Sequence, residues 1–212
     1  MNPKFFDLHS PQGDVLLHVA RGHFATPNSH VNYLVDVTVQ KTSLAQARAA
    51  AQVLAGRLKG STMVDSILCL DGTSVIGTCL ARELSAGGYR SLNGDKDIYV
   101  LRADSNSNGQ FIFLDNTRYM IADKDVLLLM SSVTTGRTAA QSLESIRYYG
   151  GRVSGIAALY SAVEETEGVK VDAVFHLSDL PEYKSYDSRE CPLCKEGKHL
   201  DALVNSYGYT LL

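Results

Sequence analysis

The sequence has few cysteines, a small net charge and no long apolar run, and each shortage excludes a class of protein. Its 212 residues include 4 cysteines, too few for the disulfide scaffold of a small secreted domain. The formal net charge of -3 gives no overall attraction for nucleic acid or an anionic membrane. Apolar runs such as Val126 to Met130 are far too short to span a bilayer. We therefore expect neither a nucleic-acid partner nor a membrane partner.

The beginning of the sequence also lacks a targeting pattern. MNPKFFDLHSPQGD has no basic region followed by an apolar stretch, the arrangement that marks a secretory signal. We therefore expect a cytoplasmic location.

Predicted strands and helices alternate along most of the chain. Aliphatic and β-branched runs typical of strands lie at residues 14–20, 31–39, 63–70, 97–101, 126–130, 152–160 and 170–177. Helical spacing of apolar residues follows Ser43, Ser74 and Thr138. This alternation predicts an α/β fold with a mainly parallel sheet flanked by helices.

Composition divides the chain into three expected parts. Residues 1–40 would form N-terminal hood strands with a polar loop, GHFATPNSH, and residues 41–177 would form the α/β core. Residues 178–212, with two prolines and the sequence CPLC, would form a C-terminal appendage packed near the N-terminal strands.

The segment VLLLMSSVTTGRT, residues 126–138, combines a predicted strand end with the groups that hold an anion. Ligands of parallel α/β sheets bind beyond the carboxyl ends of the strands, where a helix N-terminus supplies free N–H groups and partial positive charge. Gly136 lets the backbone close around an anion, and Arg137 adds charge. The threonines supply hydroxyls, so the segment predicts a phosphate site. The alternative is a hydroxyl-capped helix start that binds nothing.

Four segments resemble type I phosphoribosyltransferases. VLLLMSSVTTGRTA resembles the family's phosphoribosyl-pyrophosphate (PRPP) signature, which runs as four apolar residues, two acids, two variable residues and T-T-G-x-T. DGTSVIGTCLA (71–81) resembles the pyrophosphate loop, and IYVLR (98–102) resembles the strand before the catalytic loop of orotate phosphoribosyltransferase. The CPLC ending is similar to C-terminal segments of orotate enzymes. The resemblance covers about the whole chain in element order and implies the type I phosphoribosyltransferase fold, with a small hood from the two terminal segments.

The resemblance implies a reaction and the residues that serve it. Family enzymes join a nitrogenous base to C1 of the ribose as pyrophosphate leaves, while magnesium offsets the developing charge. The implied catalytic residues are Arg102 and Asp104, the implied base-binding residues are His23, Phe24 and His30, and the implied PRPP-binding residues are Asp71, Gly72, Thr73, Ser74, Ser131, Thr134, Thr135, Gly136, Arg137 and Thr138. The resemblance also implies magnesium as the cofactor and a homodimer as the assembly.

Two departures from the family pattern leave the activity open. Met130 and Ser131 replace the two acids that hold the ribose hydroxyls, and no cation occurs between Arg102 and Arg118, where family enzymes have lysines. The first hypothesis is an orotate-phosphoribosyltransferase-like protein that binds PRPP or a nucleoside monophosphate and transfers phosphoribosyl to a pyrimidine-type base. The second is a non-catalytic nucleotide-binding or regulatory protein. The third is another phosphoribosyl or phosphate chemistry that uses the histidine-containing loop.

Cys191 and Cys194 form a C-x-x-C sequence, which supplies half of a zinc site or a redox pair. His199 is a candidate third ligand, and a dimer could bring two cysteine pairs together. Cys69 and Cys79 lie in apolar segments typical of buried thiols. We favour metal-free packing or a tight turn over zinc, and zinc over redox chemistry, so we predict no metal ligand.

Overall fold

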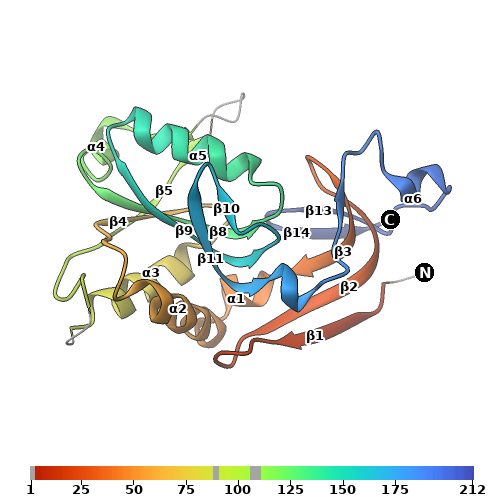
Figure 1. The fold of residues 1–212 in the computed structure, drawn as a ribbon, viewed down its shortest axis with the longest axis horizontal. Helices are drawn as coiled ribbons and strands as arrows, with labels where there is room; N and C mark the ends of the chain where they lie inside the picture. The colour runs from red at the N-terminus through yellow and green to blue at the C-terminus, as the bar shows by residue number, and fades with distance from the viewer. Residues whose placement is uncertain (1–2, 88–90, 106–110) are drawn as a thin grey trace.

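The computed structural model describes residues 3–87, 91–105 and 111–212, and it contains one large sheet in each half of the molecule (Figure 1). The core sheet has the order β10-β11-β9-β8-β4-β5. Its strands are β4 (Ser66–Cys69), β5 (Tyr99–Arg102), β8 (Asp125–Val133), β9 (Arg152–Ser161), β10 (Glu165–Thr166) and β11 (Val169–His176). All neighbours are parallel except β10 and β11. The predicted α/β fold with a mainly parallel sheet is confirmed.

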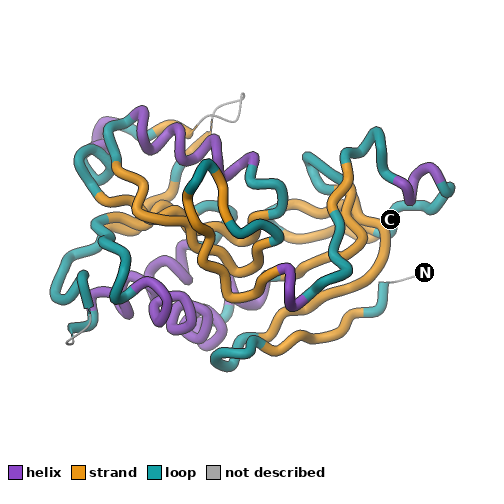
Figure 2. The backbone as a smooth tube through the Cα atoms, viewed as in Figure 1, coloured by secondary structure: helices purple, strands orange, loops and turns teal. Residues whose placement is uncertain are grey.

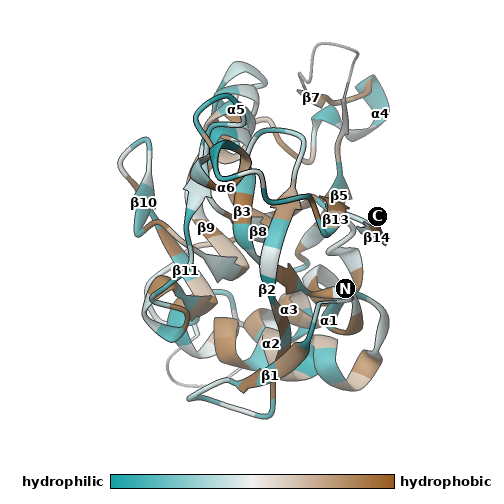
Figure 3. Ribbon diagram, turned by 90° about the vertical axis from the view of Figure 1, so that its right-hand side faces the viewer, coloured by the Kyte–Doolittle hydropathy of each residue, from teal (hydrophilic) through white to brown (hydrophobic). Residues whose placement is uncertain are grey.

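Helices cover both faces of the core sheet (Figures 1 and 2). Two helices, α2 (Leu44–Leu58) and α3 (Ser74–Ser85), lie on one face, and α5 (Arg137–Tyr148) lies on the other. Because successive side chains of a strand point to opposite faces, β8 contributes to two separate cores. Leu127 and Leu129 pack with α2 and α3, whereas Leu128 and Met130 pack with α5. Figure 3 shows more hydrophilic colour along α5 than along α2, in keeping with its exposed outer side.

The second sheet is the hood, and both ends of the chain contribute to it. Its order is β12-β3-β2-β13-β14, with β1 also paired to β2. The strands are β1 (Phe5–His9), β2 (Leu16–Ala25), β3 (His30–Asp36), β12 (Ser185–Tyr186), β13 (Ala202–Asn205) and β14 (Gly208–Leu211). The C-terminal strand β13 runs parallel to the end of β2, where Ala202 pairs with Phe24. The hood of the predicted fold is therefore present.

The remaining elements are short. They are α1 (Thr38–Thr42), α4 (Asp115–Arg118), α6 (Pro192–Lys195), the 3-10 turn η1 (Leu177–Asp179), and the hairpin of β6 (Asp104–Ser105) with β7 (Phe111–Ile112). Figure 1 shows α6 beside the hood, at the end of the molecule remote from α4. Within the described ranges, no helix has the length and apolar character needed to cross a membrane.

One predicted strand ends earlier than the sequence indicated. The apolar run 31–39 predicts a strand to residue 39, but β3 stops at Asp36 and α1 begins at Thr38. The Asp36 carboxylate accepts a hydrogen bond from the Thr38 backbone N–H at 2.9 Å. Such a local side-chain bond competes with continued strand pairing and favours a turn. The turn directs Lys41 toward the space between hood and core.

Candidate functional site

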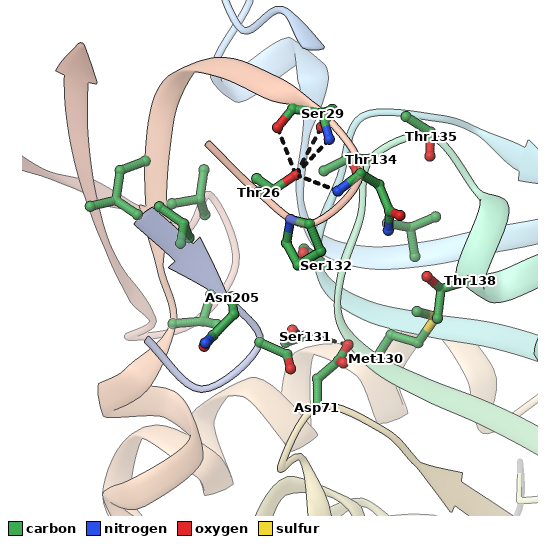
Figure 4. A pocket seen from close by; sticks show the side chains of 18 of the residues that line it. Thr26, Ser29, Asp71, Met130, Ser131, Ser132, Thr134, Thr135, Thr138 and Asn205 are labelled. Carbon is green, nitrogen blue, oxygen red and sulfur yellow. Dashed lines mark hydrogen bonds between the residues drawn. The ribbon is translucent and has the colours of Figure 1, made fainter. Parts of the chain in front are cut away.

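A cavity of about 260 Å³ lies where the hood meets the carboxyl end of β8. Figure 4 shows its side chains at close range. The segments that line it are residues 26–29 between β2 and β3, residues 34–38 with Lys41, Asp71 after β4, residues 130–139 across the end of β8 and the start of α5, and residues 204–206 with Gly208 in the last hairpin. The cavity therefore combines loops of the core with loops of the hood.

The loop that joins β8 to α5 forms the wall expected to bind phosphate. All residues from 134 to 138 line the cavity. Gly136 has a φ of 75°, and a Cβ at this position would lie 2.7 Å from Thr166 Oγ1. Both the backbone conformation and the packing therefore require glycine. No side-chain hydrogen bond caps the start of α5, which leaves its first N–H groups available to an anion.

A carboxylate reaches the second acidic position of the PRPP signature from a neighbouring loop. Ser131 Oγ donates a hydrogen bond to Asp71 Oδ2 at 3.2 Å, as Figure 4 shows. Burial raises the pKa of the Asp71 carboxyl, while hydrogen bonds from Ser131 and the positive charge of Lys41 oppose that rise. The site therefore keeps one acidic group beside the position that Ser131 occupies.

Met130 and Ser131 differ in the face of the sheet that they occupy. Met130 has 3% of its surface exposed and packs with Leu128 and Ala139 in the core under α5. Ser131 faces Asp71 instead, because adjacent residues of a strand point to opposite faces. Met130 reaches the cavity as an apolar lining group, and it offers no strong acceptor to a ribose hydroxyl.

Lys41 is a cavity residue that the sequence reasoning missed. Its ammonium group donates a hydrogen bond to the Ser206 carbonyl, and it lines the cavity with Asp71 and Asp36. Burial lowers the pKa of Lys41, while the charges of these two carboxylates oppose the fall. Lys41 lies outside the PRPP signature, so no sequence motif predicts it as a site residue. Folding of α1 against the last hairpin brings it to the cavity.

Of the predicted pyrophosphate loop, only Asp71 lines the cavity. Thr73 is fully buried, and its hydroxyl donates to the carbonyls of Leu70 and Leu129. It therefore fastens the loop to β8. Gly72 has a φ of 77° and Ser74 begins α3, and neither is among the lining residues.

The predicted catalytic residues lie apart from the cavity or outside what is described. Arg102 ends β5 with an exposed side chain and is not a lining residue. Asp104 begins β6, but its side chain lies outside the described part of the chain, as do residues 106–110. The structure therefore does not bring Arg102 together with residues 134–138.

The three residues expected to contact a base are placed elsewhere. His23 is 2% exposed and Phe24 is fully buried, so neither presents a free surface to a ring in the cavity. His30 lies beside His23, with Nδ1 3.1 Å from His23 Nε2. The loop between them, residues 26–29, lines the cavity in their place. The loop predicted to face a base therefore reaches the cavity through its tip, whereas His23, Phe24 and His30 are not among the lining residues.

Comparison with known proteins finds relatives that share a single name. No family model matches the chain. The chain is 29% identical over 151 residues to orotate phosphoribosyltransferase of Chlorobaculum parvum, covering 70% of this chain and 69% of that one. It is 26% identical over 179 residues to the enzyme of the same name from Desulforamulus reducens, covering 83% and 84%. These relatives, at modest identity over most of the chain, support a type I phosphoribosyltransferase family.

A solved structure shows the same fold. The crystal structure of orotate phosphoribosyltransferase from Aeropyrum pernix matches with a TM-score of 0.53 at 17% identity, covering 77% of this chain and 90% of that one. The fold implied by the resemblance of VLLLMSSVTTGRT is therefore confirmed.

Proposed function

We propose that this chain is an orotate-phosphoribosyltransferase-like protein whose cavity binds PRPP or a nucleoside 5′-monophosphate. The observation that carries the proposal is that residues 134–138, Asp71 and residues 26–29 line one cavity. Backbone N–H groups and hydroxyls of residues 134–138 would hold the 5-phosphate. Ser131 and Asp71 would face the ribose hydroxyls, and residues 26–29 would lie toward the base.

The proposed reaction is transfer of the phosphoribosyl group to a pyrimidine-type base. A bond forms between a ring nitrogen of the base and ribose C1, while the bond from C1 to the pyrophosphate oxygen breaks and pyrophosphate leaves. Negative charge grows on that leaving group, and cations that face it stabilise the transition state. Lys41 is a half-buried cation that lines the cavity and would serve this purpose.

The lining residues fit a magnesium ion that is shared with the ligand. Magnesium binds through one or two carboxylates together with substrate phosphates, and Asp36 and Asp71 both line the cavity. When bound, the ion would neutralise charge on the leaving pyrophosphate. Asp36 and Asp71 are the carboxylates that would hold it.

We also propose a homodimer. The residues of β5 that precede the expected catalytic loop do not line the cavity of their own chain. Arg102, the exposed residue at the end of this strand, would face the cavity of a second copy. Light scattering on the purified chain tests this assembly: a mass of two chains is expected, and a monomer at all concentrations would contradict it.

Calorimetric titration with PRPP and with orotidine monophosphate, each with and without magnesium, tests the binding site. Thr135→Ala should weaken binding about 10-fold, because a hydrogen bond to a charged group is worth about 1.5–3 kcal/mol. Thr78→Ala is the matched control, since its hydroxyl bonds within α3 outside the cavity. If neither ligand binds, or if Thr135→Ala binds as tightly as the native chain, residues 134–138 are not the phosphate-binding site.

Pyrophosphate release with orotate as acceptor tests the transfer step separately. Turnover that needs PRPP, orotate and magnesium together is expected. If the chain binds PRPP but releases no pyrophosphate when PRPP, orotate and magnesium are all present, the cavity is a ligand site and the proposed reaction is contradicted.

A further inference from the structure

Four potential metal ligands meet at the outer side of the hood, away from the cavity. They are His23 on β2, His30 at the start of β3, Cys191 at the N-cap of α6 and Cys194 within α6. One ligand atom from each lies within 4.8 Å of all the others. The sequence offered the C-x-x-C pair with His199 as a candidate third ligand; sheet pairing instead brings His23 and His30 to the two cysteines.

The spacing of these atoms matches a tetrahedral site. Zn–N bonds of about 2.0 Å and Zn–S bonds of about 2.3 Å imply tetrahedral edges of about 3.5 Å from N to S and about 3.3 Å from N to N. His23 Nε2 lies 3.5 Å from Cys191 Sγ and 3.6 Å from Cys194 Sγ. His30 Nδ1 lies 3.3 Å from Cys194 Sγ and 3.1 Å from His23 Nε2. Four edges of the tetrahedron therefore have the expected length.

Hydrogen bonding among the four groups does not account for this convergence. His23 Nδ1 lies 3.0 Å from the Lys198 carbonyl, so it carries the proton and donates it there. His23 Nε2 is then left with a single lone pair, yet three potential donors surround it. A cation at the centre accepts a lone pair from every one of the four groups. A bond from the distal ring nitrogen to a carbonyl is also the usual support of a metal-bound histidine.

We propose that His23, His30, Cys191 and Cys194 bind one zinc ion in a closed structural site. Two thiolates and two imidazoles are a donor set that suits zinc. All four tetrahedral positions come from the protein, which leaves none for a reacting water or substrate. The ion therefore holds the structure together and takes no part in chemistry.

The site would join the C-terminal segment to the hairpin of β2 and β3. Asp201 already links the same parts, because its carboxylate accepts a hydrogen bond from the His23 N–H at 2.8 Å and its own N–H donates to the His23 carbonyl. The two histidines flank residues 26–29, the loop tip that lines the cavity. Zinc would thus fix both ends of this loop.

Metal content of the reduced full-length chain is the first test. Elemental analysis should find one zinc per chain, and cobalt(II) added to the chelator-treated chain should give thiolate charge-transfer and tetrahedral visible bands. Cys194→Ser and His30→Ala should lose both signals. Cys79→Ser and His199→Ala, a thiol and an imidazole outside the cluster, are the matched controls and should keep them. A native chain that takes up neither metal, or loss in the controls, would overturn the proposal.

Thermal unfolding and hydrogen exchange give a second measurement that does not depend on catalysis. Zinc should raise the melting temperature of the chelator-treated native chain and leave that of Cys194→Ser unchanged. It should also slow amide exchange in residues 24–31 and 192–201, while β8 keeps its rate. Equal exchange with and without zinc in these two segments would contradict a structural role.

Discussion

The cavity and the histidine–cysteine cluster lie at the tip and the base of the same hairpin loop, but they are assembled in different ways. The cavity wall that is expected to bind phosphate comes from one continuous stretch, residues 130–139. The cluster joins side chains 164 residues apart, Cys194 and His30, through pairing of terminal strands in the hood. A site built from contiguous residues is visible in a sequence, whereas one built by sheet pairing is visible only after folding.

Phe24→Ala should have the largest effect and should damage both regions. Phe24 is fully buried between His23 and the cavity loop, in the core that the hood shares with α2 and α3. Removing the ring should cost about 3–5 kcal/mol in the free energy of unfolding. Urea denaturation measures this change. Leu203→Ala, a half-exposed position on the adjacent strand β13, is the control and should cost much less.

Met130→Asp tests why the first acidic position of the PRPP signature is apolar in this chain. The new carboxylate would be buried beside Leu128 and Ala139 without a partner, and an unpaired buried charge costs about 3 kcal/mol or more. We expect destabilisation at neutral pH, partly relieved in acid, and no gain in PRPP affinity. Met130→Leu, which keeps the volume, should be nearly neutral. Tighter PRPP binding by Met130→Asp at full stability would show that this face of β8 accepts a carboxylate.

Particular residues show how far the sequence could predict this molecule. Periodicity and VLLLMSSVTTGRT predicted the parallel core and the family, because strands, helices and the β8–α5 loop are local features. The same reasoning missed Lys41, since its position depends on the turn that Asp36 makes with Thr38. It also assigned His23 to a base, because no sequence spacing shows that β2 and α6 meet. Local turns and the long-range pairing of the hood decide where these residues lie.

Gly136→Ala should affect the cavity and spare the cluster. Alanine at a φ of 75° is strained, and its Cβ would lie 2.7 Å from Thr166 Oγ1. We expect a loss of about 1–3 kcal/mol in stability and a loss of PRPP binding, with zinc content unchanged. Gly168→Ala is a matched control, because its φ is 71° but its Cβ would meet open space. Equal losses in the two variants would mean that backbone strain alone, without the contact to Thr166, explains the requirement for glycine.

Asp71→Asn should have the smallest effect on stability. Whether the variant is more or less stable than the native chain distinguishes a carboxylate that serves function from one that supports the structure. Burial raises the pKa of Asp71 in the folded chain despite Lys41 and Ser131, so folding disfavours its ionised form. This penalty is present at neutral pH and disappears as the pH falls below the unfolded pKa of about 3.9. Asparagine removes the charge and can still accept the hydrogen bond from Ser131.

Asp71→Asn should therefore be slightly more stable than the native chain at pH 7, with a difference that vanishes in acid. Urea denaturation at several pH values measures this, and the exposed Asp14→Asn is the control. The same variant should bind PRPP less tightly with magnesium and keep its full zinc content, because Asp71 lines the cavity and lies outside the histidine–cysteine cluster. Lower stability at pH 7 together with native ligand affinity would mean that Asp71 supports the β4–α3 loop and does not serve the ribose. A carboxylate that costs stability yet improves ligand binding is the pattern expected of a residue retained for function.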